Sequence, residues 1–221
     1  MYLRTDKFKH TRKMALKTFV KISQVNNLTD ARYCAGMYVN WMGFSLEENN
    51  ANYLSPEKYK EITDWLSGVS YVAEFEHSHP ENILKTLQAY EGIDAIEVSQ
   101  EVHIPMLLNT GKALIFKVSI QSAEDIRELI AKAPGFKENQ VTVLLDSSIE
   151  KLSEEMISLI ADLSEQTQVL LGFGLDASTL ETTLDQTGVY GISLKGGTEI
   201  SPGLKDFDEL AEILELLEVE D

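Results

Sequence analysis

Apolar and β-branched residues recur along the chain in short runs, and amphipathic stretches separate one run from the next. This alternation predicts parallel β-strands in one sheet with helices packed outside it. Eight runs have the length and composition of buried strands: 18–23, 39–45, 69–75, 95–99, 113–118, 141–146, 168–172 and 189–194. Their spacing of roughly 20 to 30 residues favours a single (β/α)₈ barrel, the TIM barrel of the α/β class. A doubly wound open sheet would show the same alternation, so the pattern alone does not decide between them.

Two helices carry clear signals of their own. Ser55 is a candidate N-cap before Pro56 at the first helical position and Glu57 in the first turn, which predicts a helix that runs to about Trp65. Near the end of the chain, apolar residues at helical spacing with acids between them predict a last helix that packs on the barrel. These residues are Phe207, Leu210, Ile213, Leu214 and Leu217. Cys34 lies between alanines in the first helical stretch and is expected to be packed rather than reactive.

The length of 221 residues is enough for one domain with a substantial core. We found no long Pro/Gly/Ser linker, low-complexity tract or short-period repeat that would divide the chain. We therefore expect a basic N-terminal extension over residues 1–16 and one barrel domain over residues 17–221.

The charge of the chain narrows the classes of partner. Nineteen Lys and Arg residues against 36 Asp and Glu residues give a formal net charge of −17, which disfavours nucleic acid and anionic lipid as partners. The basic cluster near the start could form a short nucleic-acid arm, but so short a cluster on so acidic a body favours a solvated extension. The absence of a long apolar run, of a secretory signal and of a second cysteine predicts a cytoplasmic protein.

Several segments share the motifs of a known enzyme family. They read KISQVNNLTDA over 21–31, GF at 43–44, YLSPE over 53–57, IDAIEVS over 93–99, LLD over 144–146, LGFGL over 171–175 and GGTEISPGLKD over 196–206. In this order they resemble phosphoribosylanthranilate isomerase, whose first strand ends in Lys-Ile-Cys-Gly and whose last strand is followed by Ser-Gly-Val-Glu and Pro-Gly-x-Lys-Asp. The resemblance runs from about Lys21 to Asp206 and implies the barrel fold.

The resemblance also implies a reaction and its residues. The family catalyses an Amadori rearrangement, in which an acid opens the ribose ring and a base removes the proton from the sugar C2 position. Asp146 stands at the acid position, and Ser23 stands where the family has its cysteine base. A serine hydroxyl is a far weaker base and would need a second base behind it. Asn52 replaces the arginine that engages the anthranilate carboxylate, Glu97 replaces a glutamine, and Ser193 replaces an aspartate beside the substrate amine.

The phosphate-binding end resembles the family more closely. Gly172, Gly174, Gly196 and Gly197 follow the seventh and eighth predicted strands, where barrels often bind phosphate. Glycines there let backbone N–H groups approach an oxyanion, although any βα loop can require glycine for a positive φ. Lys195 adds a cation that could pair with a phosphate or point into solvent.

Two further groups of polar residues have alternative interpretations. Glu97, Lys117 and Asp146 could form a new polar cluster, but a charge-compensated barrel interior is favoured slightly. His77 and His79 would share a face on a continuing strand and could bind zinc, but a solvated loop is favoured. We expect no metal and no cofactor.

Three functions remain open at this stage. The first is a phosphoribosylanthranilate isomerase of tryptophan biosynthesis that is slow, with Asp146 as acid and Ser23 in the base position. The second is a non-catalytic barrel that binds a phosphorylated metabolite, and the third is a different phosphosugar enzyme that uses Glu97, Lys117 or Lys195. The replaced residues favour lost or impaired isomerase activity with the phosphate-binding end retained. The expected partner is a phosphorylated small molecule, and a homodimer is left open.

Overall fold

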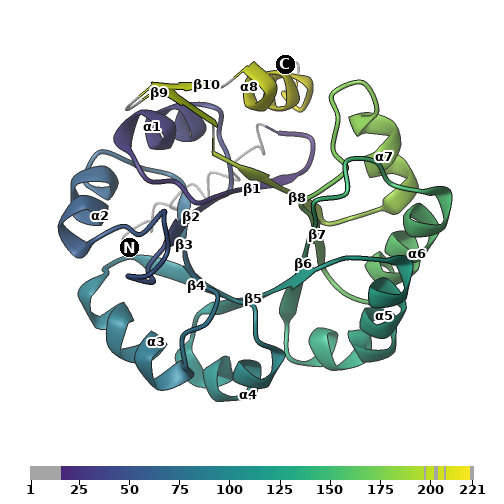
Figure 1. The fold of residues 1–221 in the computed structure, drawn as a ribbon, viewed down its shortest axis with the longest axis horizontal. Coiled ribbons are helices and arrows are strands. Elements are labelled where there is room, and N and C mark those ends of the chain that lie inside the picture. The colour runs from purple at the N-terminus through teal and green to yellow at the C-terminus, as the bar shows by residue number, and fades with distance from the viewer. Residues whose placement is uncertain (1–15, 197, 202–203, 207, 220–221) are drawn as a thin grey trace, which may run out of the picture.

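The computed structural model of the chain describes residues 16–196, 198–201, 204–206 and 208–219. Its centre is a closed barrel of eight parallel strands in chain order, with helices around it (Figure 1). The strands are β1 (Phe19–Ser23), β2 (Trp41–Ser45), β3 (Ser70–Phe75), β4 (Ile93–Val98), β5 (Ala113–Ser119), β6 (Val141–Asp146), β7 (Val169–Leu171) and β8 (Gly191–Lys195). All eight predicted strands are confirmed, and no boundary differs by more than two residues. The barrel closes because β1 pairs in parallel with both β2 and β8.

The outer layer consists of helices that follow the strands. They are α1 (Leu28–Gly36), α2 (Pro56–Thr63), α3 (Pro80–Thr86), α4 (Ile104–Leu107), α5 (Ala123–Glu138), α6 (Glu154–Ser164), α7 (Leu180–Thr187) and α8 (Asp208–Leu216). The Ser55 side chain caps α2 by accepting a hydrogen bond from the Lys58 backbone N–H, as the sequence signal predicts. The predicted last helix is confirmed as α8, whose residues Leu210, Ile213 and Leu214 are buried.

Several short elements have no counterpart in the sequence prediction. Three 3₁₀ turns flank α3 and α4: η1 (Leu87–Ala89), η2 (Glu101–His103) and η3 (Leu108–Thr110). After β8, an antiparallel hairpin forms from β9 (Thr198–Ser201) and β10 (Leu204–Asp206). None of these elements contains a continuous apolar run or a full helical period, which explains why the pattern did not reveal them.

The expected N-terminal extension lies outside the described residues except for Leu16. Leu16 is buried and forms an antiparallel bridge with Glu218, so it packs against the C-terminal segment that follows α8. Within the described part of the chain, none of the helices combines the length and the apolar character that a bilayer crossing requires.

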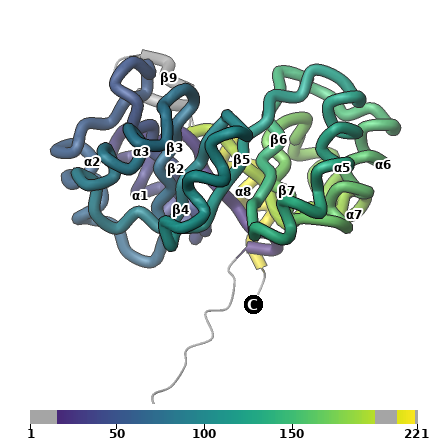
Figure 2. The backbone as a smooth tube through the Cα atoms, turned by 90° about the horizontal axis from the view of Figure 1, so that it is seen from below, coloured from purple at the N-terminus to yellow at the C-terminus, as the bar shows by residue number. Residues whose placement is uncertain are grey.

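The core has two parts. The larger part lies between the barrel strands and the helices, and Figure 2 shows α1 to α3 on one side of the strands and α5 to α7 on the other. The smaller part lies inside the barrel and consists of Val72, Ala95, Ile115, Leu144 and Leu170. Side chains two residues apart on a strand point to the same face. The next inward positions on β3, β4, β5 and β6 are therefore residues 74, 97, 117 and 146, and all four are charged.

Candidate active site

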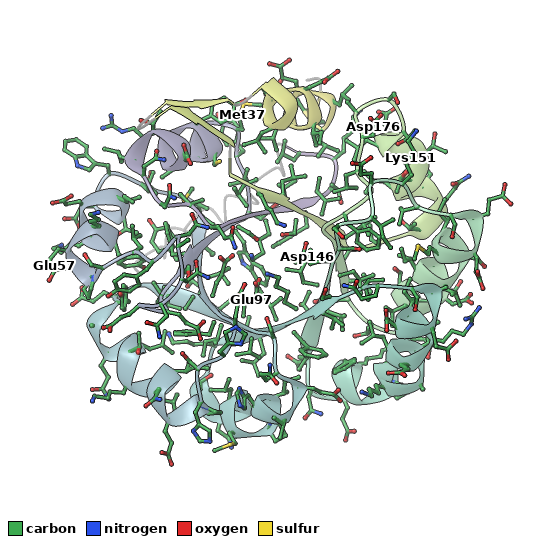
Figure 3. All side chains as sticks on the ribbon, viewed as in Figure 1. Met37, Glu57, Glu97, Asp146, Lys151 and Asp176 are labelled. Atoms are coloured by element: carbon green, nitrogen blue, oxygen red, sulfur yellow. The ribbon has the colours of Figure 1, made fainter. Side chains whose placement is uncertain are left out.

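The barrel mouth, at the carboxyl ends of the strands, gathers most of the polar residues that the sequence singled out. Glu97 and Asp146 lie within the ring of strands in Figure 3. The lining residues are Ser23, Gln24, Ser45, Asn50, Glu74, Glu76, Glu97, Lys117, Leu144, Asp146, Gly172, Ser193 and Lys195. The space between these side chains is about 20 Å³, enough for about one water molecule. A larger hollow of about 880 Å³ lies at the opposite end, but the predicted site residues are at the mouth.

A buried lysine organises the floor of the mouth. Lys21 on β1 is completely buried, and its Nζ lies 2.5 Å from Glu74 Oε1 and 2.8 Å from Glu97 Oε2. Glu74 comes from β3 and Glu97 from β4, and both are almost fully buried. Burial of charge is tolerated only when the charges are paired, and here one ammonium group faces two carboxylates. We call Lys21, Glu74 and Glu97 the floor triad.

Backbone features of β1 and β2 make room for the floor triad. A Cβ atom on Gly43 would lie 1.9 Å from Glu74 Oε1, so only glycine leaves space for that carboxylate. Gln24 follows β1 in the left-handed region, with φ 57°, and its backbone N–H donates to Glu74 Oε2 at 3.1 Å. Gln24 stands at the family's glycine position, where a left-handed backbone is easiest to form.

The floor triad perturbs the pKa of two of its members. Burial alone would lower the pKa of Lys21, but the charges of Glu74 and Glu97 outweigh burial and raise it. The Lys21 side chain is therefore protonated. Burial raises the pKa of Glu97 above its ordinary value of 4.5; Lys21 opposes this rise and Glu74 adds to it. A carboxyl group with a raised pKa is suited to proton transfer near neutral pH.

This raised pKa predicts a pH-dependent stability difference between the protein and its Glu97→Gln variant. Between the unfolded and folded pKa values of Glu97, only the folded state binds the proton, so stability falls as pH rises through that interval. The variant lacks this titration. We expect the stability of the unmodified protein, relative to Glu97→Gln, to fall by up to about 1.4 kcal/mol per pH unit as pH rises above about 4.5.

Urea unfolding from pH 4 to pH 8 measures this difference. Glu61→Gln removes an exposed carboxylate on α2 and serves as the matched control, whose curve should run parallel to that of the unmodified protein. Parallel curves for Glu97→Gln as well would contradict a raised pKa at this position.

Ser23, in the predicted base position, is tied to the floor triad. Lys21 Nζ donates a hydrogen bond to Ser23 Oγ at 2.6 Å, and Ser193 Oγ lies 3.2 Å from the same oxygen. A serine acts as a base or nucleophile only when a neighbour accepts its proton. Protonated Lys21 is a donor and has no acceptor site.

Asp146, at the predicted acid position, lies between two ammonium groups. Lys117 Nζ and Lys195 Nζ are each 3.5 Å from its carboxylate, and Lys117 is also 3.5 Å from Glu76. Burial alone would lower the pKa of Lys117, but Glu97, Asp146 and Glu76 raise it. Glu97, Lys117 and Asp146, which the sequence suggested as a polar cluster, therefore meet at the mouth, and their charges compensate one another.

Asn52 lies beside the mouth in a network of neutral amides. Its Oδ1 accepts from Asn26 Nδ2 at 3.1 Å, and its Nδ2 donates to Gln24 Oε1 at 3.2 Å. Asn50 Oδ1 accepts from the Asn52 backbone N–H at 2.8 Å. These partners are all neutral, in contrast to the arginine that the family has at the Asn52 position.

The glycines predicted to bind phosphate have structural roles in the barrel. The backbone N–H of Gly172 donates to Leu145 O at 2.8 Å, and that of Gly196 donates to Ser23 O at 3.2 Å. Gly174 has a positive φ of 63°, which favours glycine in this turn. Gly197 lies outside the described residues.

The other sequence candidates lie away from the mouth lining. Cys34 is fully buried in α1, as predicted. His79 caps α3 by accepting from the Glu81 backbone N–H at 3.4 Å, and the His77 backbone N–H donates to Glu47. Among the described residues, no group of three or more His, Cys, Asp or Glu side chains is placed so that it could hold a metal ion.

Sequence reasoning missed the floor triad as a unit. Lys21 stands out there only as part of the motif KISQVNNLTDA, and Glu74 only as part of the predicted strand 69–75. A lysine at an inward position of a buried strand was the available signal, because such a charge requires a buried partner.

Comparisons with known proteins place these observations in a family. Residues 20–216 match the family model described as N-(5'phosphoribosyl)anthranilate (PRA) isomerase. The N-(5'-phosphoribosyl)anthranilate isomerase of Sulfurihydrogenibium sp. is 25% identical over 207 residues, which cover 90% of this chain and 98% of the relative. That of Aquifex aeolicus is 27% identical over 205 residues, covering 88% and 96%.

Solved structures agree on the fold. Phosphoribosyl anthranilate isomerase from Thermotoga maritima superposes with a TM-score of 0.73 at 21% identity, covering 90% of this chain and 98% of that chain. The isomerase from Pyrococcus furiosus gives a TM-score of 0.70 at 18% identity, with the same coverage. The family match spans nearly all of the barrel that carries the mouth. The chain belongs to the phosphoribosylanthranilate isomerase family of tryptophan biosynthesis.

Proposed function

We propose that this chain is a member of the family that holds a phosphorylated small molecule at its barrel mouth and catalyses the isomerisation of phosphoribosylanthranilate weakly or not at all. The contact between Lys21 Nζ and Ser23 Oγ carries the proposal. Ser23, in the base position, accepts a hydrogen bond from the protonated Lys21 side chain. Protonated Lys21 cannot take up the serine proton. The side chain at this position is therefore unable to accept the proton that the family removes from the sugar C2 position.

The substrate side supports the same conclusion. Recognition of a carboxylate exploits the planar fork and fixed charge of arginine. The amide of Asn52 has no charge, and its hydrogen bonds go to Asn26 and Gln24. Asp146 alone supplies only one half of the acid–base pair.

We assign the phosphate-binding end of the mouth to Lys195 and to the turn that contains Gly174. Lys195 is the last residue of β8, and its side chain is 63% exposed, so its ammonium group is available to an anion. One solved relative was crystallised with reduced 1-(o-carboxyphenylamino)-1-deoxyribulose 5-phosphate, a phosphorylated ligand. Because the N–H groups of Gly172 and Gly196 bond within the barrel, we assign the anion chiefly to Lys195.

A turnover assay tests the catalytic part. Phosphoribosylanthranilate is supplied to the purified protein, to Asp146→Asn and to Ser23→Cys/Asn52→Arg, and its disappearance is followed by fluorescence beside an active relative such as the Aquifex aeolicus enzyme. We expect turnover by the unmodified chain to be at least about 10²-fold below that of the relative, the smallest usual contribution of a general base. Turnover within tenfold of the relative, abolished in Asp146→Asn, would overturn the proposal.

Thermal denaturation with inorganic phosphate tests the binding part. We expect phosphate to raise the melting temperature of the unmodified protein and of Lys85→Met, which removes a lysine of α3 outside the mouth lining. Lys195→Met should lose most of the increase. An equal increase in both variants would place the anion elsewhere.

A homodimer remains part of the proposal. One Thermotoga maritima relative is described as dimeric. Sedimentation velocity of the purified chain over a range of concentrations measures its oligomeric state, and a single monomeric species at all concentrations would contradict this part.

A further inference from the structure

The charges of the mouth are distributed unevenly between its two sides. Glu74 and Glu97 on β3 and β4 place carboxylates on one side, and Glu76 follows β3 at the rim. Lys195 stands at the end of β8 on the other side, next to the turns that follow β7 and β8. Lys117 on β5 lies between the two sides, 3.5 Å from both Glu76 and Asp146. The acidic side therefore has three carboxylates against buried Lys21 and the shared Lys117, and a ligand that spans the mouth meets carboxylates at one end and Lys195 at the other.

The acidic side has more negative charge than its own cation neutralises. Lys21 is shared between Glu74 and Glu97, so the buried floor triad has one positive and two negative formal charges. Glu97 is 3% exposed, and its Oε2 is paired with Lys21 Nζ at 2.8 Å, the same ammonium group that Glu74 contacts at 2.5 Å. Two buried carboxylates that share one ammonium group are costly to keep charged, and a second cation from a ligand would relieve that cost.

The same side disfavours a ligand that carries a carboxylate. Glu74 and Glu97 would repel it, and the neutral amide of Asn52 does not offset this repulsion. A ligand ammonium group has the opposite property, since it is attracted by both carboxylates and donates up to three hydrogen bonds.

We propose that the mouth binds a phosphate monoester that also carries a protonated amine, such as an amino-sugar phosphate, with the amine at Glu97 and Glu74 and the phosphate at Lys195. This inference rests on the proposed function, because it places the phosphate at the same end. It adds the chemical class of the ligand and the residues that select it.

Entry of such a ligand requires side chains to move. The free space in the mouth is about 20 Å³, and Lys117 and Lys195 both approach Asp146 at 3.5 Å. Lys195 is largely exposed, so it can turn from the Asp146 carboxylate towards a phosphate without a change in the barrel. Long lysine side chains make this rearrangement inexpensive compared with a shift of the strands.

A matched pair of ligands and a matched pair of variants test the proposal. Glucosamine 6-phosphate and glucose 6-phosphate differ only in an amine and a hydroxyl group, and isothermal titration measures the dissociation constant of each at pH 7. We expect the unmodified protein to bind glucosamine 6-phosphate at least tenfold more tightly than glucose 6-phosphate. Glu61→Gln, which loses an exposed carboxylate on α2, should show the same preference. Glu97→Gln should reduce this preference to about twofold.

Glu74→Gln provides a second variant if Glu97→Gln does not fold, and we expect it to reduce the preference as well. Equal affinities of the unmodified protein for the two sugars would overturn the inference while leaving a phosphate-binding mouth intact. An amine preference that survives both variants would also overturn it. Failure of both sugars and of inorganic phosphate to bind would instead overturn the binding part of the proposed function.

Discussion

Replacement of Lys21 by methionine is expected to destabilise the protein by about 3–5 kcal/mol, because it leaves two buried carboxylates without their cation. Methionine matches the length of the aliphatic part of lysine, so lost packing contributes little. Since small domains are stable by only about 5–15 kcal/mol, the variant should unfold at a much lower urea concentration.

A triple variant separates charge from packing in this experiment. Lys21→Met/Glu74→Gln/Glu97→Gln removes the cation and both anions, and we expect it to recover most of the lost stability. Replacement of a whole buried ion cluster is often neutral, whereas removal of one partner is strongly destabilising. The deficit of Lys21→Met alone should also shrink at acid pH, where protonated carboxyl groups need no counter-ion. A triple variant as unstable as the single one, or a single variant that loses less than about 1 kcal/mol, would show that the floor triad does not behave as paired charges.

Substitution of Gly43 by alanine is expected to destabilise the protein by about 3 kcal/mol, at the upper end of the usual effect of overpacking. The new Cβ would lie 1.9 Å from Glu74 Oε1 and 3.1 Å from Lys21 Nζ. Either the Glu74 carboxylate moves away from Lys21 or β2 shifts against its neighbours, and both responses weaken the floor triad. Urea unfolding measures the loss.

Two further variants serve as comparisons for the unfolding of Gly43→Ala. Gly135 lies on the exposed face of α5, and a Cβ atom added there would meet no heavy atom within 4 Å, so Gly135→Ala should stabilise the protein by about 0.5–1 kcal/mol. Glu74→Asp withdraws the carboxylate by one methylene, and in combination with Gly43→Ala it should be less harmful than the sum of the single changes. Strict additivity would mean that Gly43 and Glu74 do not compete for the same space.

The sequence by itself determined the order and number of the barrel strands. Strands buried on both faces require nearly continuous apolar runs, and this requirement is local, so all eight runs could be recognised without tertiary information. The caps of α2 and the stripe of α8 are local signals of the same kind. The hairpin of β9 and β10 escaped detection because its strands, TEIS and LKD, contain no continuous apolar run, unlike the equally short β7, VLL.

The candidate site could be predicted only in part. Asp146, Glu97, Ser193 and Lys195 end or lie in recognised strands, and parallel strands bring their carboxyl ends to one face, so a common location at the mouth followed from the sequence. The partners of Ser23 did not follow, and its hydrogen bond with Lys21 changes what its hydroxyl group can do.

Only the tertiary structure decided how the charges pair. Lys21 and Glu74 are 53 residues apart and lie on strands that are not neighbours, and closure of the barrel brings their charged groups to 2.5 Å. The absence of a side chain at Gly43 on the intervening strand permits that approach. Ion pairing inside a barrel depends on positions across its interior, which no local pattern of hydrophobic and polar residues encodes.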